Sequence, residues 1–359
     1  MMSEAENRKN LLWVDAPGGA YPIYWEPDFA GLAAAFAAVG LGGRKLFIIT
    51  DSHVEPLYAQ AVARALEDIG PVACTAFPAG EGSKHLATIQ SFYDFLLEHK
   101  ADRKSVVVAL GGGVTGDMAG FAAATFLRSL PFVQIPTTLL AQVDSSVGGK
   151  VGVDFRGVKN LIGAFYQPRL VYMAQSTLST LPRREYGAGM AEVLKTALIW
   201  DEGFWDFLRQ NREALLARDE EALREAQRRC CAAKAAVVAQ DERESGLREI
   251  LNFGHTVGHA VESCLGFRLL HGECVGLGML CALRLSGLPT DTLRDELRAY
   301  GLPERVEGLT KEEIYEQMFL DKKVRDGKLR FVLLSRVGKA YSTDEVSRAA
   351  LFDALEEIV

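Results

Sequence analysis

The sequence contains no apolar run approaching the roughly 18 residues that a membrane-spanning helix needs. Residues 1–13 are polar and include acidic side chains, so the N-terminus lacks the apolar core of a secretory signal peptide. Low-complexity tracts are also absent, and 48% hydrophobic with 24% charged residues is ordinary for a globular protein. We therefore expect a cytoplasmic protein with no membrane partner.

Acidic residues outnumber basic ones, 47 to 40, and cysteines are few. The formal net charge is −7, which argues against a nucleic-acid partner, although a pocket can still be locally basic. The six cysteines show no Cys-x-x-Cys spacing, and Cys230 and Cys231 are adjacent. This pattern indicates isolated thiols in a reducing compartment rather than a disulfide framework.

The length of 359 residues suits two domains, and the pattern of apolar and polar residues changes near residue 184. Short Val-, Ile- and Phe-rich runs alternate with helical patterns in the first part, which predicts an α/β domain with a mostly parallel, Rossmann-like sheet over residues 1–184. Residues 185–359 read mainly as helices. The strands expected are Lys45–Thr50, Val72–Phe77, Ser105–Leu110, Phe132–Pro136, Leu170–Met173 and, late in the chain, Leu329–Leu334. The helices expected are Leu57–Asp68, Leu86–His99, Tyr186–Trp200, Phe204–Ala239, Glu249–Cys264 and Val275–Leu285.

A glycine-rich loop, Gly111–Asp117, follows the expected strand Ser105–Leu110 and precedes a helical pattern. Glycines allow a phosphate to approach the backbone, and a helix N-terminus offers free N–H groups. A tight strand-to-helix turn is the structural alternative. Three further polar loops follow other strands, which favours a nucleotide site; they contain Asp51 and His53, Glu81 and Lys84, and Thr137 and Thr138.

A second glycine-rich stretch, residues 143–150, ends in Lys150, and Lys159 and Asn160 follow shortly after it. Small residues beside a cation suit the binding of an anionic group. A flexible surface turn explains the same pattern, so both interpretations stay open at this point.

Histidines and a carboxylate suggest a metal site in the second half. His255 and His259 are four residues apart and so share one helix face, but the glutamate of a zinc-protease motif is missing. His271 opens another apolar helix, and Glu192 lies in an apolar helical stretch where a buried carboxylate needs a partner. Three of these four residues would suffice for a catalytic zinc with an open position.

Arg248 and Asn252 precede the two histidines at steps of four and three residues. This spacing predicts one continuous helix that carries Arg248, Asn252, His255 and His259 along a single line. An amphipathic helix with a polar outer stripe is the alternative.

Taken together, these segments closely resemble the 3-dehydroquinate synthase family over roughly Asp51 to Lys339. The match is densest over Ala109–Pro168. The motifs that carry it are IPTTLLAQVDSSVGGK (Ile135–Lys150), KNLIGAFYQP (Lys159–Pro168), GMAEVLK (Gly189–Lys195), DERESGLREILNFGHTVGHAVE (Asp241–Glu262), LHGE (Leu270–Glu273) and DKKVRDGKLRFVLL (Asp321–Leu334).

The resemblance implies NAD in the N-terminal domain and a zinc or cobalt ion in the helical one. The implied metal ligands are Glu192, His255 and His271, which leaves His259 to the substrate. Arg128 matches an arginine that the family's homodimer donates to the neighbouring subunit. The other implied substrate residues are Asp144, Lys150, Asn160, Lys195, Lys234, Arg248, Asn252 and Lys322. The implied NAD contacts are Asp51, His53, Glu81, Lys84, Gly113, Val114, Thr115, Gly116, Asp117, Thr137, Thr138, Lys150, Lys159, Thr177, Leu178, Ser179 and Thr180.

The family's reaction converts 3-deoxy-D-arabino-heptulosonate 7-phosphate, a phosphorylated sugar acid, into 3-dehydroquinate and phosphate. It belongs to the shikimate pathway and proceeds through oxidation, phosphate elimination, reduction, ring opening and aldol closure, with NAD regenerated. One departure is visible at residues 153–158, where family members often have Asn-His-Pro. The alternatives are a metal-dependent polyol dehydrogenase, another sugar-phosphate cyclase and a non-catalytic NAD-binding regulator. The many substrate-side cations are excessive for an uncharged polyol. Lys234, Asn252 and Lys322 keep the residues typical of the dehydroquinate family, which argues against another cyclase. The complete metal and lysine set argues against a regulator.

Overall fold

The computed structural model describes residues 10–244, 246–266, 268–320 and 329–359. The chain divides into two compact units, Met1–Leu181 with Lys234–Glu242, and Pro182–Ala233 with Arg243–Val359. The last part of helix α9 (Glu220–Gln240) is therefore grouped with the first unit. The single boundary expected near residue 184 remains a prediction. Among the described residues, no helix is both long and apolar enough to cross a membrane.

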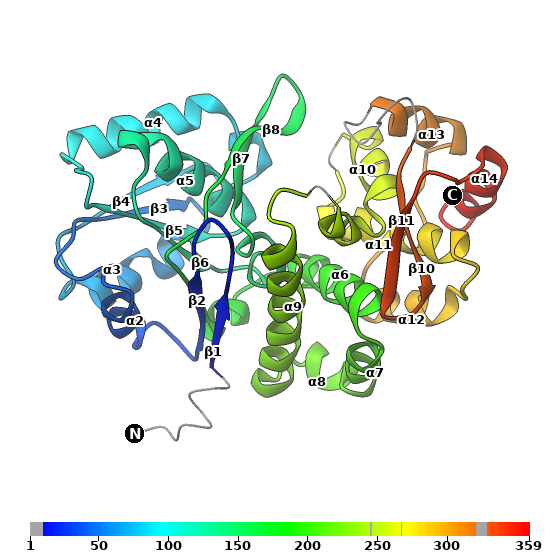
Figure 1. The fold of residues 1–359 in the computed structure, drawn as a ribbon, viewed down its shortest axis with the longest axis horizontal. Helices are drawn as coiled ribbons and strands as arrows, with labels where there is room; N and C mark the ends of the chain where they lie inside the picture. Colours follow the sequence, from blue (N-terminus) through cyan, green and yellow to red (C-terminus); the bar gives the residue numbers. More distant parts are fainter. Residues whose placement is uncertain (1–9, 245, 267, 321–328) are drawn as a thin grey trace. The chain divides into compact units, whose positions relative to one another are not determined.

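The first unit is built on a seven-stranded sheet with the order β1-β2-β9-β6-β5-β3-β4 (Figure 1). Within this sheet, the pairs from β2 to β4 are parallel, and β1 pairs antiparallel with β2. The predicted α/β class with a mostly parallel sheet is thereby confirmed. The strands are β1 (Leu11–Val14), β2 (Tyr21–Glu26), β3 (Leu46–Asp51), β4 (Val72–Phe77), β5 (Val106–Gly111), β6 (Phe132–Pro136) and β9 (Leu170–Ala174).

Both faces of the sheet are buried, which explains why its central strands are apolar without alternation. Along β3, Leu46 and Ile48 pack into one core with helices α2 (Leu32–Ala38) and α3 (Gln60–Leu66). Phe47 and Ile49 pack into the opposite core with α4 (Leu86–Glu98) and α5 (Gly113–Thr125). The unit also contains short helical segments, among them η1 (Glu55–Ala59), η2 (Glu81–Ser83), η3 (Phe126–Arg128) and η5 (Gln175–Ser179).

The polar segment after β6 forms a hairpin that the sequence pattern did not predict. It follows the short helix η4 (Ala141–Ser145) and consists of β7 (Lys150–Phe155) and β8 (Val158–Phe165), paired antiparallel. A Cβ added at Gly152 would lie 2.5 Å from the carbonyl oxygen of Ile162 across the pair. Glycine at this position therefore permits close approach of the two strands.

The second unit is mainly helical, with one hairpin of β10 (Phe331–Arg336) and β11 (Lys339–Thr343). Its helices besides α9 are α6 (Arg183–Trp200), α7 (Glu202–Gln210), α8 (Arg212–Leu216), η6 (Leu247–Asn252), α10 (His255–Cys264), α11 (His271–Leu285), α12 (Asp291–Ala299), α13 (Lys311–Leu320) and α14 (Arg348–Leu355).

Two long helices expected from the sequence are interrupted in the structure. The prediction of one helix over Phe204–Ala239 was wrong. This segment comprises α7, α8 and α9, with breaks at Asn211 and at Arg218, whose φ is 58°. The segment Glu249–Cys264 was also wrong as one helix, because Gly254 at φ 77° separates η6 from α10. A single left-handed residue ends a helix without altering its apolar pattern.

Candidate metal and nucleotide sites

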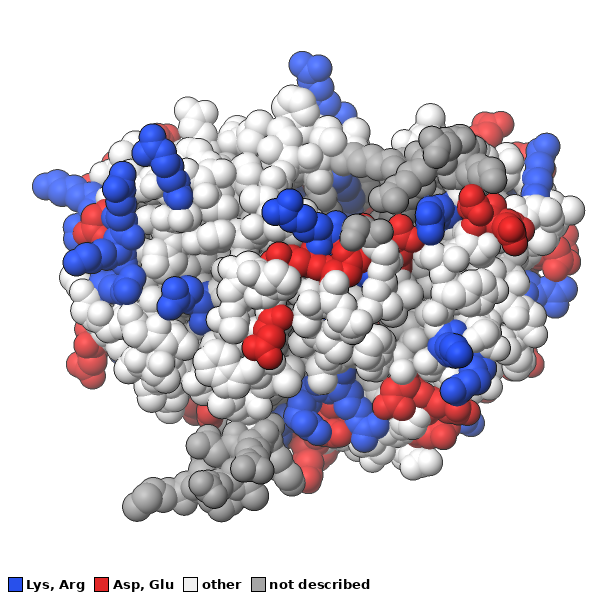
Figure 2. Space-filling view, in the orientation of Figure 1, with Lys and Arg blue, Asp and Glu red and all other residues white. Residues whose placement is uncertain are grey.

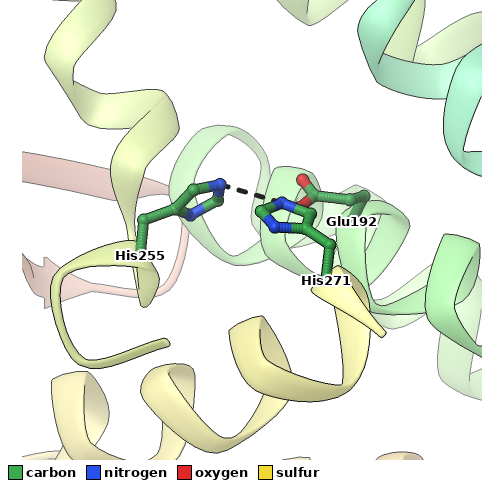
Figure 3. A group of neighbouring side chains, drawn as sticks. All are labelled: Glu192, His255 and His271. Atoms are coloured by element: carbon green, nitrogen blue, oxygen red, sulfur yellow. Dashed lines mark ion pairs between the residues drawn. The ribbon is translucent and has the colours of Figure 1, made fainter. Parts of the chain in front are cut away.

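Three helices of the second unit bring a carboxylate and two imidazoles together. Glu192 comes from α6, His255 from the start of α10 and His271 from the start of α11 (Figure 3). Glu192 Oε1 lies 3.3 Å from His271 Nε2 and 3.7 Å from His255 Nε2. One ligand atom from each residue lies within 4.8 Å of the other two, so the three can hold one metal ion.

Glycines allow these helices to approach closely. A Cβ added at Gly272, next to His271, would collide with the carbonyl oxygen of Ala188 on α6. A Cβ at Gly254, next to His255, would lie 2.8 Å from Met279 N on α11. Each histidine is thus adjacent to a residue at which two backbones touch, which positions its ring relative to Glu192.

Glu192 is 1% exposed, yet neither of its oxygens makes a hydrogen bond of ordinary geometry with another described residue. Its Oε2 lies 2.5 Å from Nζ of Lys195, while Oε1 faces the two imidazoles. Burial by itself would raise the pKa of Glu192, but Lys195 and His271 hold it below its usual range. A buried, ionised carboxylate with one oxygen directed at two imidazole nitrogens fits a divalent metal.

The break before α10 also places a backbone carbonyl beside the ring of His255. Phe253 O lies 3.1 Å from His255 Nδ1, and a carbonyl can only accept, so Nδ1 carries the proton. Nε2 is then the atom available to a metal. The predicted continuous row from Arg248 to His259 was wrong: Arg248 and Asn252 lie on the 3-10 helix η6, before Gly254.

His259 lies one turn after His255 on α10 and forms a second possible metal group with Glu262 and His271. Burial disfavours a charged His271, but Glu192 and Glu262 outweigh this effect and raise the pKa of His271 to about 9.

Glu262, 3% exposed, was missed by the sequence analysis. Glu262 could have been recognised as Glu192 was, because it is an acidic residue among apolar helical residues. It also lies three residues after His259.

In the first unit, the glycine-rich loop joins β5 directly to α5. The helix begins at Gly113, and no side chain caps its first turn. Thr115 donates a hydrogen bond to Asp51 Oδ2, while Asp51 Oδ1 accepts from the backbone of His53 and Val54. Asp51 thus organises the loops at the ends of β3 and β5, and the uncapped N–H groups suit an anion.

Four charged residues predicted to contact NAD lie together. Lys84 Nζ is 2.7 Å from Asp117 Oδ2 and 4.0 Å from Glu81 Oε1, and Lys159 Nζ is 3.4 Å from the same Glu81 atom. Burial disfavours the charged lysine, but Asp117 and Glu81 raise the pKa of Lys84, so it remains an ammonium. The cluster offers both carboxylates and cations to a polar ligand.

The two threonine segments follow β6 and β9. Thr137 is 4% exposed, and its hydroxyl has no hydrogen-bond partner among the described residues, so it is available to a ligand. Thr138 accepts from Ala141 N, and Thr177 donates to Ala174 O, so both have local structural partners. The other residues predicted to contact NAD differ in exposure. Leu178 is buried and Val114 is partly buried, whereas His53, Ser179 and Thr180 are exposed. The Thr180 hydroxyl contacts the Tyr58 hydroxyl.

The other predicted substrate residues divide between the two units. In the first, Lys234 Nζ donates to Asp144 Oδ1 at 2.6 Å, and Lys150 and Asn160 are exposed on the β7–β8 hairpin. In the second, Arg248 is 2% exposed. Lys322 lies outside the described residues.

Sequence models of one enzyme family match most of the chain. The model of the 3-dehydroquinate synthase N-terminal domain matches residues 74–188, and that of the C-terminal domain matches residues 189–324. The chain belongs to the 3-dehydroquinate synthase family. It is therefore an enzyme, as the motifs indicated.

Curated relatives support the same family. The 3-dehydroquinate synthase of Acetivibrio thermocellus is 49% identical over 329 residues, covering 89% of this chain and 91% of the relative. That of Desulforamulus reducens is 46% identical over 354 residues, covering 96% and 99%. The resemblance to the 3-dehydroquinate synthase family is thus confirmed.

Solved structures of two other cyclases share the fold. A 2-deoxy-scyllo-inosose synthase complexed with carbaglucose-6-phosphate, NAD+ and Co2+ matches with a TM-score of 0.86 and 25% identity, covering 97% of this chain and all of that one. A 2-epi-5-epi-valiolone synthase from Streptomyces hygroscopicus with NAD+ and Zn2+ has a TM-score of 0.86 and 28% identity, with 94% and 96% covered. The 3-dehydroquinate synthase relatives are much closer in sequence than these two cyclases.

Proposed function

We propose that this chain converts 3-deoxy-D-arabino-heptulosonate 7-phosphate into 3-dehydroquinate and phosphate with recycled NAD and a divalent zinc or cobalt ion. The observation that carries the proposal is the buried Glu192 with two imidazoles on neighbouring helices, in a chain 46–49% identical to curated 3-dehydroquinate synthases. The two other cyclases are only 25–28% identical. A shikimate-pathway lyase is therefore favoured over another cyclase.

The metal would be held by Glu192, His255 and His271. When bound, the metal supplies Lewis-acid stabilisation of an alkoxide, and NAD takes up and returns a hydride. Lys195 neutralises Oε2 of Glu192 and so directs Oε1 toward the imidazoles. Three protein ligands leave a coordination position open, as catalytic rather than structural zinc sites do.

NAD would be bound by the first unit. The uncapped N-terminus of α5, from Gly113 to Asp117, suits its pyrophosphate. Lys84 and Lys159 would add positive charge, and the unpartnered hydroxyl of Thr137 would add a hydrogen bond. Asp51, Glu81 and the Thr177–Thr180 segment complete the proposed contacts.

The lysines and amides would hold the substrate. Lys150, Asn160 and Lys195 suit the departing phosphate, whose own oxygen can take the proton from the adjacent carbon as the C–O bond breaks. Arg248, with Lys234, Asp144, Asn252 and Lys322, suits the carboxylate and hydroxyls, since a guanidinium binds a carboxylate through two bonds. His259, half-buried on α10, suits proton transfer to and from hydroxyls.

We further propose a cytoplasmic homodimer in which Arg128 reaches the neighbouring subunit. Leu127, Arg128 and Ser129 have φ values of 50°, 67° and 111°, a left-handed run that non-glycine residues adopt at a cost. Leu161 and Phe165 on β8 are 45% and 46% exposed, and Leu127 is 41% exposed. Exposed apolar side chains on β8, and Leu127 next to the strained Arg128, support a protein contact on the first unit.

The charge distribution agrees with a small-molecule substrate rather than a nucleic acid. In Figure 2, Lys and Arg side chains lie among Asp and Glu side chains and broad uncharged areas across the face in view. The net charge is −7. The described basic residues assigned to the substrate belong to particular elements instead: Lys150 to β7, Lys195 to α6, Lys234 to α9 and Arg248 to η6.

The activity is tested by incubating the protein with 3-deoxy-D-arabino-heptulosonate 7-phosphate, substoichiometric NAD and zinc, while phosphate and NADH absorbance are followed together. We expect phosphate release over many turnovers without accumulation of NADH. NADH rising in step with substrate loss would indicate a dehydrogenase, and an absence of phosphate would indicate another substrate.

A further inference from the structure

We infer that Glu262 is a positioning residue of the metal site, which orients His271 so that its Nε2 faces Glu192. This inference rests on the proposed metal-dependent function. It assigns to Glu262 a role that the motifs did not give it.

The geometry of His271 carries the inference. Its Nε2 lies 3.3 Å from Glu192 Oε1, and its Nδ1 lies 3.7 Å from Glu262 Oε2. The imidazole is thus placed between two carboxylates from different helices, α6 and α10. The 3.7 Å separation exceeds a hydrogen bond but is within the range of an ion pair.

The position of Glu262 on α10 explains how it reaches the ring. His255, His259 and Glu262 follow at steps of four and three residues, so they share one face of the helix. The side chain of Glu262 is only 4% exposed. A carboxylate buried to this extent is costly unless it interacts with positive charge or donors, which an imidazole N–H supplies.

The two histidines are then oriented in the same way, each by an oxygen that lies beside Nδ1. Phe253 O accepts from Nδ1 of His255, and Glu262 would accept from Nδ1 of His271. Each acceptor keeps the proton on Nδ1 and leaves Nε2 as the ligand atom. The carboxylate also makes the ring a stronger donor to a metal.

A second metal ion held by His259, Glu262 and His271 is the competing explanation, because these three residues also form a possible ligand group. His271 would then bind one ion through each nitrogen and would have to lose both ring protons. A carboxylate hydrogen bond to Nδ1 requires no such ionisation, so the structure favours the positioning role.

The test measures zinc binding by the metal-free full-length chain in competition with a chelator, for the parent and for Glu262→Gln. We expect one zinc per chain in both, with affinity lowered about 10–100-fold in the variant. The visible absorption of the cobalt-loaded protein should shift, because the orientation and basicity of one ligand change. Glu296→Gln is the matched control: Glu296 is fully buried but pairs with Arg212, so its zinc affinity should stay at the parent value.

Glu262→Asp, which keeps the buried charge but shortens the side chain, should bind zinc with intermediate affinity and serves if Glu262→Gln does not fold. Unchanged affinity and spectrum in the folded variants would overturn the inference. Two zinc ions in the parent with one in the variant would also overturn it, in favour of the second ion, as would a parent that binds no zinc. Turnover of the parent reports on the proposed function separately.

Discussion

At the scale of single residues, the two oxygens of Glu192 have different partners. Oε2 is paired with Lys195, three residues later on the same helix, and Oε1 faces imidazoles from two other helices. A buried carboxylate that could pair fully with a lysine would have little affinity left for a metal. The division of its oxygens explains how Glu192 can be ionised, buried and still available to bind an ion.

His271→Ala should abolish tight zinc binding and turnover while NAD affinity stays at the parent value. The expected loss in zinc affinity exceeds the 10–100-fold that removal of an outer partner costs. Zinc competition titration and NAD fluorescence titration measure the two effects.

His259→Ala is the matched control, because it removes a neighbouring imidazole that we assign to the substrate. It should keep its zinc and lose turnover. A zinc-free His259→Ala variant together with zinc-loaded His271→Ala would reverse the assignment of the two histidines.

At the scale of elements, the break at Gly254 has a function that an unbroken helix would not provide. The left-handed residue ends η6, starts α10 and leaves Phe253 O beside Nδ1 of His255. It also lets α10 cross closely over α11, where Gly278 contacts the backbone of Gly254. One glycine therefore sets the helix start, the interhelical contact and the orientation of a ligand.

Gly254→Ala should lower the free energy of unfolding by about 2–4 kcal/mol, because a left-handed alanine and overpacking each cost about 1–2 kcal/mol or more. Its Cβ would lie 2.8 Å from Met279 N and 2.9 Å from Val275 O. Chemical denaturation measures the loss, and zinc affinity should fall with it.

Gly266→Ala provides the control for backbone conformation alone. Gly266 has a φ of +57°, and a Cβ there would meet nothing within 4 Å. The Gly266→Ala substitution should lower the free energy of unfolding by only about 1 kcal/mol and leave zinc affinity unchanged. Equal losses in the two variants would show that interhelical packing at Gly254 is unimportant.

At the scale of the whole molecule, the proposed dimer depends on the β7–β8 hairpin and the segment before β6. The Tyr166 hydroxyl donates to Leu130 O, which ties the segment after β8 to the one that follows Arg128. The apolar side chains and the arginine therefore belong to one connected part of the first unit.

Leu161→Glu should shift the protein toward a monomer and lower its turnover at least tenfold, since Arg128 would no longer reach a partner. Placing a charge in an apolar contact opposes association. Sedimentation velocity and activity across a dilution series measure the two effects together.

The matched control is Leu97→Glu on α4, where the leucine is 63% exposed. It should leave both association and turnover unchanged. A fully active Leu161→Glu monomer would refute the proposed role of Arg128 across subunits.

The sequence by itself determined the central sheet and the candidates for chemistry. The four apolar runs that became β3, β5, β6 and β9 are buried along their whole length, so their composition alone marks them, whereas β4 is an edge strand in which only Phe77 is buried. The motifs identified the family and named Glu192, His255 and His271, whereas spacing alone left four candidates. Local pattern suffices for these features because neighbours in the chain decide them.

Only the tertiary structure decided how the ligands meet and what supports them. The contact of Gly254 with α11, the close approach of Gly152 to Ile162 O across the hairpin and the approach of Glu262 to His271 all depend on how separate elements pack against each other. A glycine has no side chain whose pattern could reveal its role, and a buried acid is recognised only once its surroundings are known. Contacts between elements, rather than composition within them, supply that information.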